Sequence, residues 1–341
     1  MDIKGKDLIC TQDWSLEELE HTLKVAHDMK KKRYADKYTD LLKHRTFLMF
    51  FYNPSVRTRQ SFEAAATELG GHAQFLEPKS MRLKTKHSAG ETIEDAANVM
   101  SRYAVGLGIR ILEDKIASYG DGDRLLREYA EYASIPIVNM ADDRFHPCQG
   151  LADIMGLQQR MGSNLKRKKL LMVWGQGALA RSWCSIQENL LISSRFGMDV
   201  TLAYPEGYDL DPEVIEMTKA NCKANGSSFN ITNDTVEGYQ GVDVVYSRNW
   251  KSPTAYASGE YDKAGEIEKA MRYRGWTCDE EKMRLTNNGL YIHPMPVDRG
   301  NEVTDAVASS ERSIIIDVAE NRLHVQKAVM GLTMSDKRIE F

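Results

Sequence analysis

Short apolar segments alternate with helix-length amphipathic stretches along almost the whole chain. Such alternation is typical of parallel α/β sheets, because two parallel strands must be joined by a crossover long enough to hold a helix. The sequence therefore predicts an α/β fold with doubly wound parallel sheets. The expected strands are residues 46–51, 72–76, 105–111, 135–140, 169–174, 199–204, 243–246, 289–293 and 313–317.

The length of 341 residues is enough for two hydrophobic cores. A helix expected over residues 150–161 is followed by the polar stretch GSNLKRKKLL, and a second sheet is expected to begin at Lys169. We therefore expect one domain at residues 1–148 and a second at residues 149–319. A last helix, within residues 320–335, is expected to pack back on the first domain.

The composition excludes several classes of protein. Hydrophobic residues make up 42% and charged residues 28%, and the formal net charge of -4 argues against a general nucleic-acid or membrane-surface binder. The five cysteines lie far apart and form no C-x-x-C pair, so we expect neither a disulfide framework nor a metal site. Since no segment has the length of a membrane span and the N-terminus lacks a signal-peptide core, we expect a reducing, cytoplasmic setting.

The segment FYNPSVRTRQ, residues 51–60, predicts a strand, a tight turn and the start of a helix. An Asn-Pro pair is followed by Ser55, a capping-type residue, and the helix is expected to begin at Thr58 or Arg59. The N–H groups at a helix start lie at the positive end of the helix dipole and can hold an anion. Arg57 and Arg59 add charge that suits a phosphate group. The alternative is a pair of surface arginines beside an ordinary capped helix.

Three other polar stretches follow expected strands. GIRIL places Arg110 at a strand end, FHPCQGLAD places His146 and Gln149 before a helix, and YIHPMPVDRG places H-P-M-P after a strand. Ligands of α/β sheets bind at the carboxyl ends of the strands, so these stretches are expected to converge on one cleft with the anion-binding turn. Each stretch alone is more often structural, and the hypothesis depends on their occurring together.

A second pattern suggests a different function. Gly175, Gly177 and Ala180 spell G-x-G-x-x-A between an expected strand and an expected helix, as in dinucleotide-binding turns. Those turns also require an acidic residue at the end of the next strand, where this chain has Ala203 and Tyr204. An NAD-dependent dehydrogenase is therefore the weaker interpretation.

The chain resembles the aspartate and ornithine carbamoyltransferase family from about residue 13 to residue 332. Five motifs occur in the family's order and spacing: S-x-R-T-R from Ser55, the arginine Arg110, H-P-x-Q from His146, H-P-x-P from His293, and AENRLHVQKAVM. The resemblance implies a carbamoyl phosphate domain first, an acceptor domain second, and a homotrimer whose active sites are shared between neighbouring subunits. It implies no metal and no organic cofactor.

In that family an amine attacks the carbonyl carbon of carbamoyl phosphate, and the tetrahedral oxyanion then expels phosphate. Such a reaction needs positioning and electrostatic stabilisation. The residues that the resemblance implies for binding carbamoyl phosphate are Ser55, Val56, Arg57, Thr58, Arg110, His146, Gln149, Pro294, Met295 and Arg322. Among them Arg57, Thr58, Arg110 and His146 are expected to be catalytic. Val56 stands where the family usually has threonine, so a weaker grip on phosphate is expected.

The acceptor motifs point in different directions. H-P-x-P and the segment around Arg181 resemble the aspartate enzymes, which favours an acceptor with a carboxylate. Arg248 stands where ornithine enzymes carry an aspartate for the free α-amino group, so like charge disfavours plain ornithine. SRNW also resembles enzymes that use N-acetyl- or N-succinyl-ornithine, although the chain lacks their proline-rich loop. The expected acceptor-binding residues are Arg181, Arg248, Met295, Arg299, Lys84 and Lys86.

Lys84 and Lys86 belong to residues 78–91, where the family sends a loop into the neighbouring active site. A solvated basic loop is an equal alternative. The leading hypothesis is a carbamoyltransferase that acts on an amino-acid-like acceptor with a carboxylate, and an ornithine or N-acylornithine carbamoyltransferase proper is the alternative. A non-catalytic ligand-binding homologue is a third class, disfavoured because a pure binder need not keep groups that stabilise an oxyanion.

Overall fold

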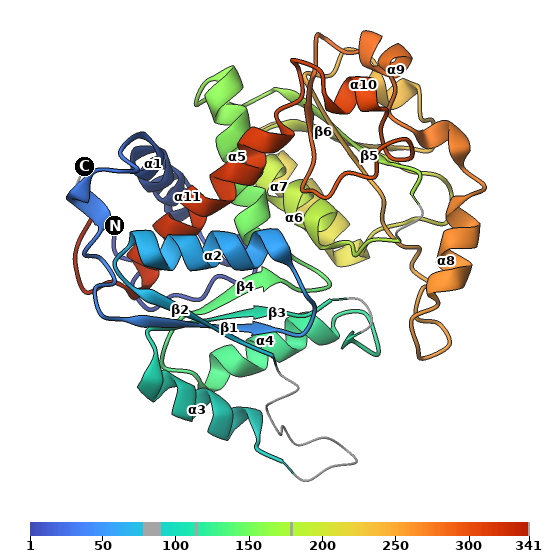
Figure 1. Cartoon of the computed structure of the whole chain (residues 1–341). Helices are drawn as coiled ribbons and strands as arrows, with labels where there is room; N and C mark the ends of the chain where they lie inside the picture. The colour runs from blue at the N-terminus through green and yellow to red at the C-terminus, as the bar shows by residue number, and fades with distance from the viewer. Residues whose placement is uncertain (78–89, 113–114, 178–179, 340–341) are drawn as a thin grey trace. The chain divides into compact units, whose positions relative to one another are not determined.

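The computed structural model describes residues 1–77, 90–112, 115–177 and 180–339 (Figure 1). The chain divides into two compact units, which are described separately. Unit 1 comprises Met1–Leu151 and Asn321–Phe341, and unit 2 comprises Ala152–Glu320. Each unit is built on its own parallel sheet, so the expected fold class is confirmed.

The sheet of unit 1 has the strand order β2-β1-β3-β4, with every neighbouring pair parallel. Its strands are β1 (Thr46–Phe51), β2 (His72–Leu76), β3 (Gly106–Arg110) and β4 (Ile137–Ala141). The helices of this part of the chain are η1 (Thr11–Asp13), α1 (Leu16–Lys31), η2 (Asp36–Tyr38), α2 (Val56–Glu68), α3 (Ile93–Tyr103) and α4 (Asp121–Tyr132).

Helices cover both faces of the unit 1 sheet, with α2 on one face and α3 and α4 on the other (Figure 1). The alternation of side chains along β1 explains the two layers. Phe47 stacks on Phe62 of α2 at 5.6 Å between ring centroids, and Phe50 meets Tyr129 of α4 edge-on at 6.1 Å. Because residues three apart on a strand point to opposite faces, one aromatic strand supplies both cores.

The pairing of β3 with β4 contains an irregularity at its carboxyl end. Ile109 pairs with Asn139, but Arg110 pairs with Ala141, so Met140 is the extra residue of a bulge. Ala141 has φ 131°, a value that strongly favours glycine. Bulges re-aim the groups at a strand end, and this one lies where the sequence predicts a ligand site.

The sheet of unit 2 has the order β7-β6-β5-β8-β9, again entirely parallel. Its strands are β5 (Lys169–Trp174), β6 (Asp199–Ala203), β7 (Phe229–Thr232), β8 (Val244–Arg248) and β9 (Leu290–Ile292). Its helices are α6 (Cys184–Arg195), α7 (Pro212–Asn225), η5 (Glu237–Tyr239), α8 (Lys263–Ala270), η6 (Arg274–Trp276), α9 (Glu280–Arg284) and α10 (Asp305–Ala308).

Two helices contain residues of both units: α5 (Pro147–Met161) and α11 (Ile315–Met334). The strand expected at residues 313–317 is wrong, because residues 315–317 open α11; short apolar runs alone do not separate strand from buried helix. The C-terminal half of α11 packs on unit 1, where the Lys327 ammonium contacts Glu68 of α2 at 2.8 Å. No helix in the described part of the chain is long and apolar enough to cross a membrane.

Candidate active site

The turn that begins α2 has the geometry of an anion-binding helix start. Ser55 is the N-cap, and its hydroxyl accepts the N–H of Thr58 at 3.4 Å. The helix begins at Val56, two residues before the earlier of the two starts expected from the sequence, so Val56, Arg57 and Thr58 form its first turn. N–H groups of a first turn have no acceptor within the helix and face whatever lies before it.

Thr58 and Arg322 meet at this turn although 264 positions separate them in the sequence. Both are buried, and Arg322 Nη2 donates to Thr58 Oγ1 at 2.9 Å. Arg57 is exposed, as is Val56. Arg59 lies elsewhere, with its guanidinium 3.9 Å from the ring centre of Phe75 and its Nε 2.8 Å from Glu63. Of the two neighbouring arginines, Arg59 therefore has a structural role.

Backbone hydrogen bonds join the α2 turn to the carboxyl end of β3. The Tyr52 N–H donates to the Arg110 carbonyl at 2.9 Å, and the Leu112 N–H donates to Asn53 Oδ1 at 2.6 Å. Arg110 Nη1 in turn donates to the Met140 carbonyl at 3.3 Å, which the bulge of β4 presents. Three neighbouring strand ends of unit 1 thus meet at one edge of the sheet.

His146 and Gln149 lie at the start of α5, just after this edge. His146 is 6% exposed and Gln149 is 1% exposed. The His146 carbonyl accepts the N–H groups of Gln149 at 2.9 Å and Gly150 at 3.1 Å, so the backbone of His146 forms the helix start. Unit 1 therefore brings together, at the β1, β3 and β4 ends, most of the residues predicted for carbamoyl phosphate.

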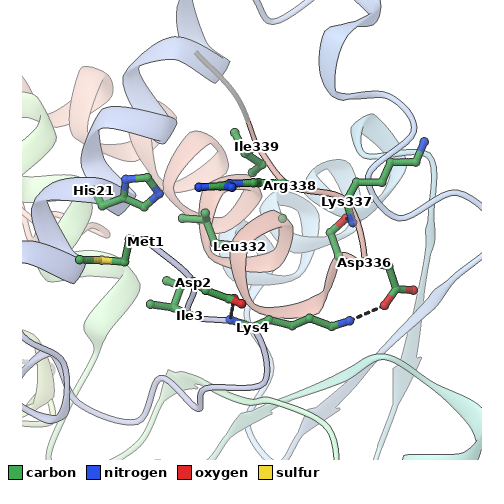
Figure 2. A pocket seen from close by; sticks show the side chains of 12 residues that line it. Met1, Asp2, Ile3, Lys4, His21, Leu332, Asp336, Lys337, Arg338 and Ile339 are labelled. Carbon is green, nitrogen blue, oxygen red and sulfur yellow. Dashed lines mark hydrogen bonds and ion pairs between the residues drawn. The ribbon is translucent and has the colours of Figure 1, made fainter.

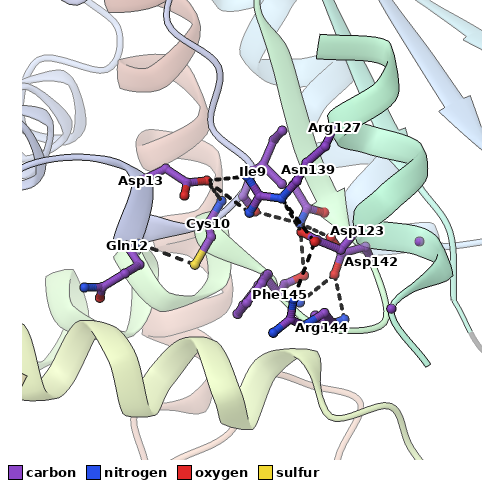
Figure 3. Close-up of polar contacts among 12 residues, drawn as sticks. Ile9, Cys10, Gln12, Asp13, Asp123, Arg127, Asn139, Asp142, Arg144 and Phe145 are labelled. Atoms are coloured by element: carbon purple, nitrogen blue, oxygen red, sulfur yellow. Dashed lines mark hydrogen bonds and ion pairs between the residues drawn. The ribbon is translucent and has the colours of Figure 1, made fainter. Parts of the chain in front are cut away.

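Buried carboxylates hold the turn between β4 and His146 (Figure 3). Asp142 Oδ1 accepts the N–H groups of Arg144 at 2.7 Å and Phe145 at 2.5 Å. Asp143 accepts N–H groups at the start of α4, including those of Gly120 and Gly122. A side chain at Gly122 would place its Cβ 2.6 Å from Asp143 Oδ1, so this close approach requires glycine.

The charge around this turn is unbalanced toward the negative. Burial raises the pKa of Asp142 well above its usual range, and the neighbouring carboxylates Asp143 and Asp123 raise it further. Burial also raises the pKa of Asp143. Asp123 itself lies 3.1 Å from Arg127 and 3.6 Å from Arg144. The acidic turn is thus held by hydrogen-bond donors more than by countercharge.

In unit 2, Arg248 ends β8 and is 7% exposed. Its Nε and Nη1 are buried and make no hydrogen bond to any described residue. Arg181 is half-buried, and its N–H donates to Asn249 Oδ1 at 3.1 Å, which links the chain after β5 to the chain after β8. A buried cation with open donors is typical of a site that receives an anionic group.

The two glycines of G-x-G-x-x-A have a packing role. A Cβ at Gly175 would lie 2.9 Å from Ser247 Oγ, and one at Gly177 would lie 3.0 Å from Asn249 Cβ. Helix α6 begins only at Cys184, so the described part of the turn is not the start of a helix. Because a dinucleotide turn leads directly into a helix, the structure removes the basis of the dehydrogenase interpretation.

The H-P-M-P turn of unit 2 is organised by one buried acid, Glu302. Glu302 Oε1 accepts the Asn249 N–H at 2.7 Å, and Oε2 accepts the Asp298 N–H at 2.9 Å. His293 Nε2 lies 3.0 Å from the same Oε2, and His293 Nδ1 accepts the Met295 N–H at 2.9 Å. Since Nδ1 is an acceptor, the proton of the neutral ring is on Nε2 and points to Glu302.

Electrostatics favour this charge distribution. Burial alone would raise the pKa of Glu302, but the charge that His293 carries when protonated, its hydrogen bond and the charge of Arg248 outweigh burial and lower the pKa to about 2. Burial lowers the pKa of His293. Glu302 is therefore an anion beside a neutral imidazole, and it fixes the ends of β8 and β9 relative to each other within unit 2.

The remaining predicted residues differ in their surroundings. Pro294 is buried, and Met295 is half-buried with φ 57°. Arg299 is exposed, and its Nη1 donates to Asp305 Oδ1 at 3.0 Å and to Ser309 Oγ at 2.8 Å. Lys84 and Lys86 lie outside the described residues.

Sequence reasoning missed the residues that support the predicted ones. Asn139, Asp142, Asn249 and Glu302 are almost completely buried and polar, and each bonds a segment that carries a predicted site residue. Asp142 could have been noticed as an acid between the expected strand at residues 135–140 and His146. Glu302 gives no comparable signal, because only the fold brings it to His293.

A cavity of about 320 Å³ lies between the two ends of the chain in unit 1 (Figure 2). Asp2, Lys4, His21, Asp336 and Arg338 are among its lining residues, and none of the predicted site residues is. The described residues contain no group of three or more His, Cys, Asp or Glu side chains that could hold a metal ion.

Comparisons with known proteins match the chain in two consecutive parts. The model of the carbamoyl-P binding domain of aspartate/ornithine carbamoyltransferases matches residues 6–159, and that of the Asp/Orn binding domain matches residues 168–333. The chain belongs to the aspartate/ornithine carbamoyltransferase family. The resemblance seen in the sequence is therefore confirmed, and the relatives of this chain are enzymes.

Individual relatives of this family divide between two acceptors. The ornithine carbamoyltransferase of Pyrococcus abyssi is 34% identical, with 99% of each chain covered. The N-acetylornithine carbamoyltransferase of Xanthomonas campestris pv. campestris is 35% identical, with 98% of this chain and 99% of the relative covered. A crystal structure of acetylornithine transcarbamylase complexed with acetylcitrulline superposes with a TM-score of 0.90 at 34% identity, covering 97% of this chain and 100% of the other.

Proposed function

We propose that this member of the carbamoyltransferase family transfers the carbamoyl group of carbamoyl phosphate to the amine of an amino acid that carries a carboxylate and an acylated α-amino group. Carbamoyl transfer to an amino-acid acceptor is the reaction of its relatives. Buried Arg248, with its unbonded Nε and Nη1, is the observation that carries the choice of acceptor.

The reaction makes one bond and breaks one. The amine nitrogen attacks the carbonyl carbon, the carbonyl electrons move to oxygen, and the oxyanion then expels phosphate with the electrons of the C–O bond. The nitrogen loses one proton, and the departing phosphate is basic enough to accept it. Because the charge that develops is on one oxygen and one phosphate, the protein's task is to place donors and cations around them.

Unit 1 supplies those donors in our proposal. The first turn of α2, with Ser55, Val56, Arg57 and Thr58, holds the phosphate, and Arg322 supports Thr58 through their 2.9 Å hydrogen bond. Arg110 and His146 donate hydrogen bonds to the carbonyl oxygen. Each donor lowers the free energy of the transition state by about 3 kcal/mol. Gln149 accepts from the carbamoyl NH₂ group, a role that the family resemblance also implies for the carbonyls of Pro294 and Met295, which belong to unit 2. The joined ends of β1, β3 and β4 support the first two assignments.

Unit 2 supplies the acceptor site in our proposal. Arg181 and Arg248 bind the acceptor carboxylate or the acyl oxygen, and a free ammonium group beside buried Arg248 meets like charge. Glu302 limits the net charge of this region, but its oxygens are occupied by Asn249, Asp298 and His293. Arg299 contributes less in this proposal, because Asp305 and Ser309 already accept hydrogen bonds from its guanidinium.

We also propose a homotrimer in which the loop with Lys84 and Lys86 completes a neighbouring active site. An exposed apolar face of α3 supports an oligomer: Val99 and Tyr103, one helical turn apart, are 42% and 73% exposed. A cytoplasmic setting is part of the proposal, supported by the odd number and wide spacing of the five cysteines, which form no C-x-x-C pair. Light scattering of the purified chain tests the trimer directly.

The test of the acceptor is a panel of amines incubated with carbamoyl phosphate: aspartate, ornithine, N-acetylornithine and N-succinylornithine. Phosphate release and ureido product are both measured. We expect kcat/KM for an N-acylated ornithine to exceed that for ornithine at least tenfold, or about 1.4 kcal/mol. Ornithine as the best substrate would contradict the acceptor assignment, and inertness across the panel would contradict carbamoyl transfer.

A pair of variants separates Arg248 from general charge effects. Arg248→Leu is expected to lose discrimination against ornithine, because the like charge is gone. Arg167→Leu removes an exposed cation of the same unit, whose guanidinium contacts Asp199 at 2.9 Å, and is expected to leave the acceptor preference unchanged. Equal acceptor preferences in the two variants would show that Arg248 does not select the substrate.

A further inference from the structure

Asn139 connects the segment before η1 with the bulge at the end of β4 and the turn that follows it (Figure 3). It is completely buried in unit 1. Its Oδ1 accepts the Ala141 N–H at 2.9 Å. Its Nδ2 donates to Asp142 Oδ2 at 2.8 Å and to the Ile9 carbonyl at 2.8 Å, and lies 3.3 Å from the Phe145 carbonyl. If the amide were reversed, its NH₂ would face the Ala141 N–H and its oxygen would face the Asp142 carboxylate. The network therefore fixes the orientation of the Asn139 amide.

The bond from Ala141 to Asn139 holds a backbone shape that costs free energy. With φ 131°, Ala141 occupies a region that residues other than glycine avoid. This shape moves Ala141 opposite Arg110 and leaves the Met140 carbonyl to accept Arg110 Nη1. Asn139 therefore acts on Arg110 through the bulge.

The bond from Asn139 to Asp142 acts on His146 in the same way. Asp142 holds the N–H of Phe145 at 2.5 Å, and its own N–H donates to the Phe145 carbonyl at 3.1 Å. Asn139 Nδ2 adds a contact to that carbonyl. Both ends of the residue that precedes His146 are thus tied to the Asn139–Asp142 pair, which sets the direction in which the His146 ring leaves the backbone.

We propose that Asn139 is a positioning residue for carbamoyl transfer, which aligns Arg110 and His146 through the bulge and through Asp142. The proposal rests on the proposed function in so far as Arg110 and His146 act on the carbonyl oxygen. An amide is needed here because one side chain must accept from a backbone N–H and donate to a buried carboxylate, and aspartate can only accept when it is ionised.

The test exchanges the two partners. Asn139→Asp sets two carboxylates 2.8 Å apart, and Asp142→Asn sets two NH₂ groups together. Each single variant is expected to lower kcat by about tenfold to a hundredfold, since a lost buried hydrogen bond disturbs both donors. The double variant Asn139→Asp with Asp142→Asn restores one donor and one acceptor and keeps the net charge. We expect it to recover at least about fivefold over Asn139→Asp alone.

A matched control is available in unit 2. Asn189 Nδ2 donates to Asp153 Oδ2 at 2.9 Å, and both residues are completely buried. Asn189→Asp therefore creates the same kind of buried carboxylate pair in a contact that includes none of Ala141, Asp142 and Phe145. Asn189→Asp is expected to lower the thermal unfolding temperature, as Asn139→Asp does. Its kcat per folded enzyme molecule is expected to equal that of the wild type.

A spectroscopic readout decides the inference even if the proposed function fails. The chain has 8 histidines, and their ring signals can be observed by NMR after selective ¹⁵N-histidine labelling, with His146→Gln identifying the His146 signal. We expect the His146 signal to move in Asn139→Asp and in Asp142→Asn, to return toward its wild-type position in the double variant, and to stay in place in Asn189→Asp. An unmoved His146 signal in the folded single variants would overturn the inference, whereas an inactive wild-type enzyme would overturn only the proposed function.

Discussion

The turn before His146 in unit 1 and the turn after His293 in unit 2 are both ordered by a buried carboxylate, but the charges around the two carboxylates differ. Each follows a parallel strand, and in each a buried carboxylate accepts backbone N–H groups: Asp142 in unit 1 and Glu302 in unit 2. The pKa of Asp142 is raised by burial and by other acids, whereas the pKa of Glu302 is lowered to about 2. Hydrogen-bond donors suffice to shape such a turn, and the surrounding charge decides how it responds to pH.

The largest effect is expected from removing the acid of unit 2. Glu302→Ala leaves the N–H groups of Asn249 and Asp298 and the ring of His293 without their acceptor. Breaking such a buried, hydrogen-bonded charge costs about 3–5 kcal/mol. Denaturant unfolding measures this loss. Glu302→Gln keeps the shape and one oxygen, so its loss should be smaller, about 1–3 kcal/mol; equal losses in the two variants would refute the role of the charge.

The two histidines are expected to differ in kind. His146→Gln should lower kcat by on the order of a hundredfold, about 3 kcal/mol, with little change in stability, because we place its ring at the reacting oxygen. His293→Gln should lower stability by about 1–3 kcal/mol, because it breaks the bonds to Glu302 and Met295. Turnover and thermal unfolding of both variants check the contrast, which fails if His293→Gln loses turnover alone.

Acid should affect the two turns in opposite directions. The Glu302 carboxyl has a pKa near 2 in the folded chain against an ordinary 4.5, so its stabilisation is complete above pH 4.5 and is lost as the pH falls toward 2. The pKa of Asp142 is raised, so as the pH falls this carboxyl is protonated in the folded chain before it is protonated in the unfolded chain. Acidification therefore removes the cost of its buried charge and favours the folded state. Unfolding free energies from pH 7 to pH 3 should fall less steeply in Glu302→Gln and more steeply in Asp142→Asn than in the wild type.

The smallest effect is expected at the cap of α2. Ser55→Ala removes the acceptor of the Thr58 N–H and should cost about 1 kcal/mol of stability. It should also weaken phosphate binding, measured by calorimetry, because we place phosphate at this turn. Thr92→Ala is the matched control, since Thr92 caps α3 by accepting the Asp95 N–H at 3.0 Å. A similar change of phosphate affinity in both variants would argue against the α2 site.

The sequence predicted the elements of the fold well where local pattern and tertiary burial agree. The strands at residues 46–51 and 169–174 are found at those bounds, and the expected capping residue Ser55 is the N-cap of α2. The pattern failed at two places. Strand β7, at the edge of the sheet, alternates apolar and polar residues over only four positions (FNIT), too few to stand out in the sequence. The apolar run at residues 313–317 contributes to the start of α11.

The residues of the candidate site also fall into those that the sequence predicts and those that it does not. Motif order alone gave the family, because charged and polar residues at strand ends are recognisable by type and spacing. The residues that hold them could not be predicted: Asn139 matters because a bulge places Ala141 beside its amide, and Glu302 matters because β8 and β9 end side by side.

What the amino-acid order determined by itself is the set of elements and the chemistry carried at their ends, since both depend on neighbours within a few residues. What only the tertiary structure decided is which buried polar group satisfies which backbone donor, since hydrogen bonds such as that from the Asp298 N–H to Glu302 and that from Arg322 to Thr58 depend on distances set by packing. A hydrogen bond needs its two atoms within about 3 Å, and that precision arises only after the sheets have formed.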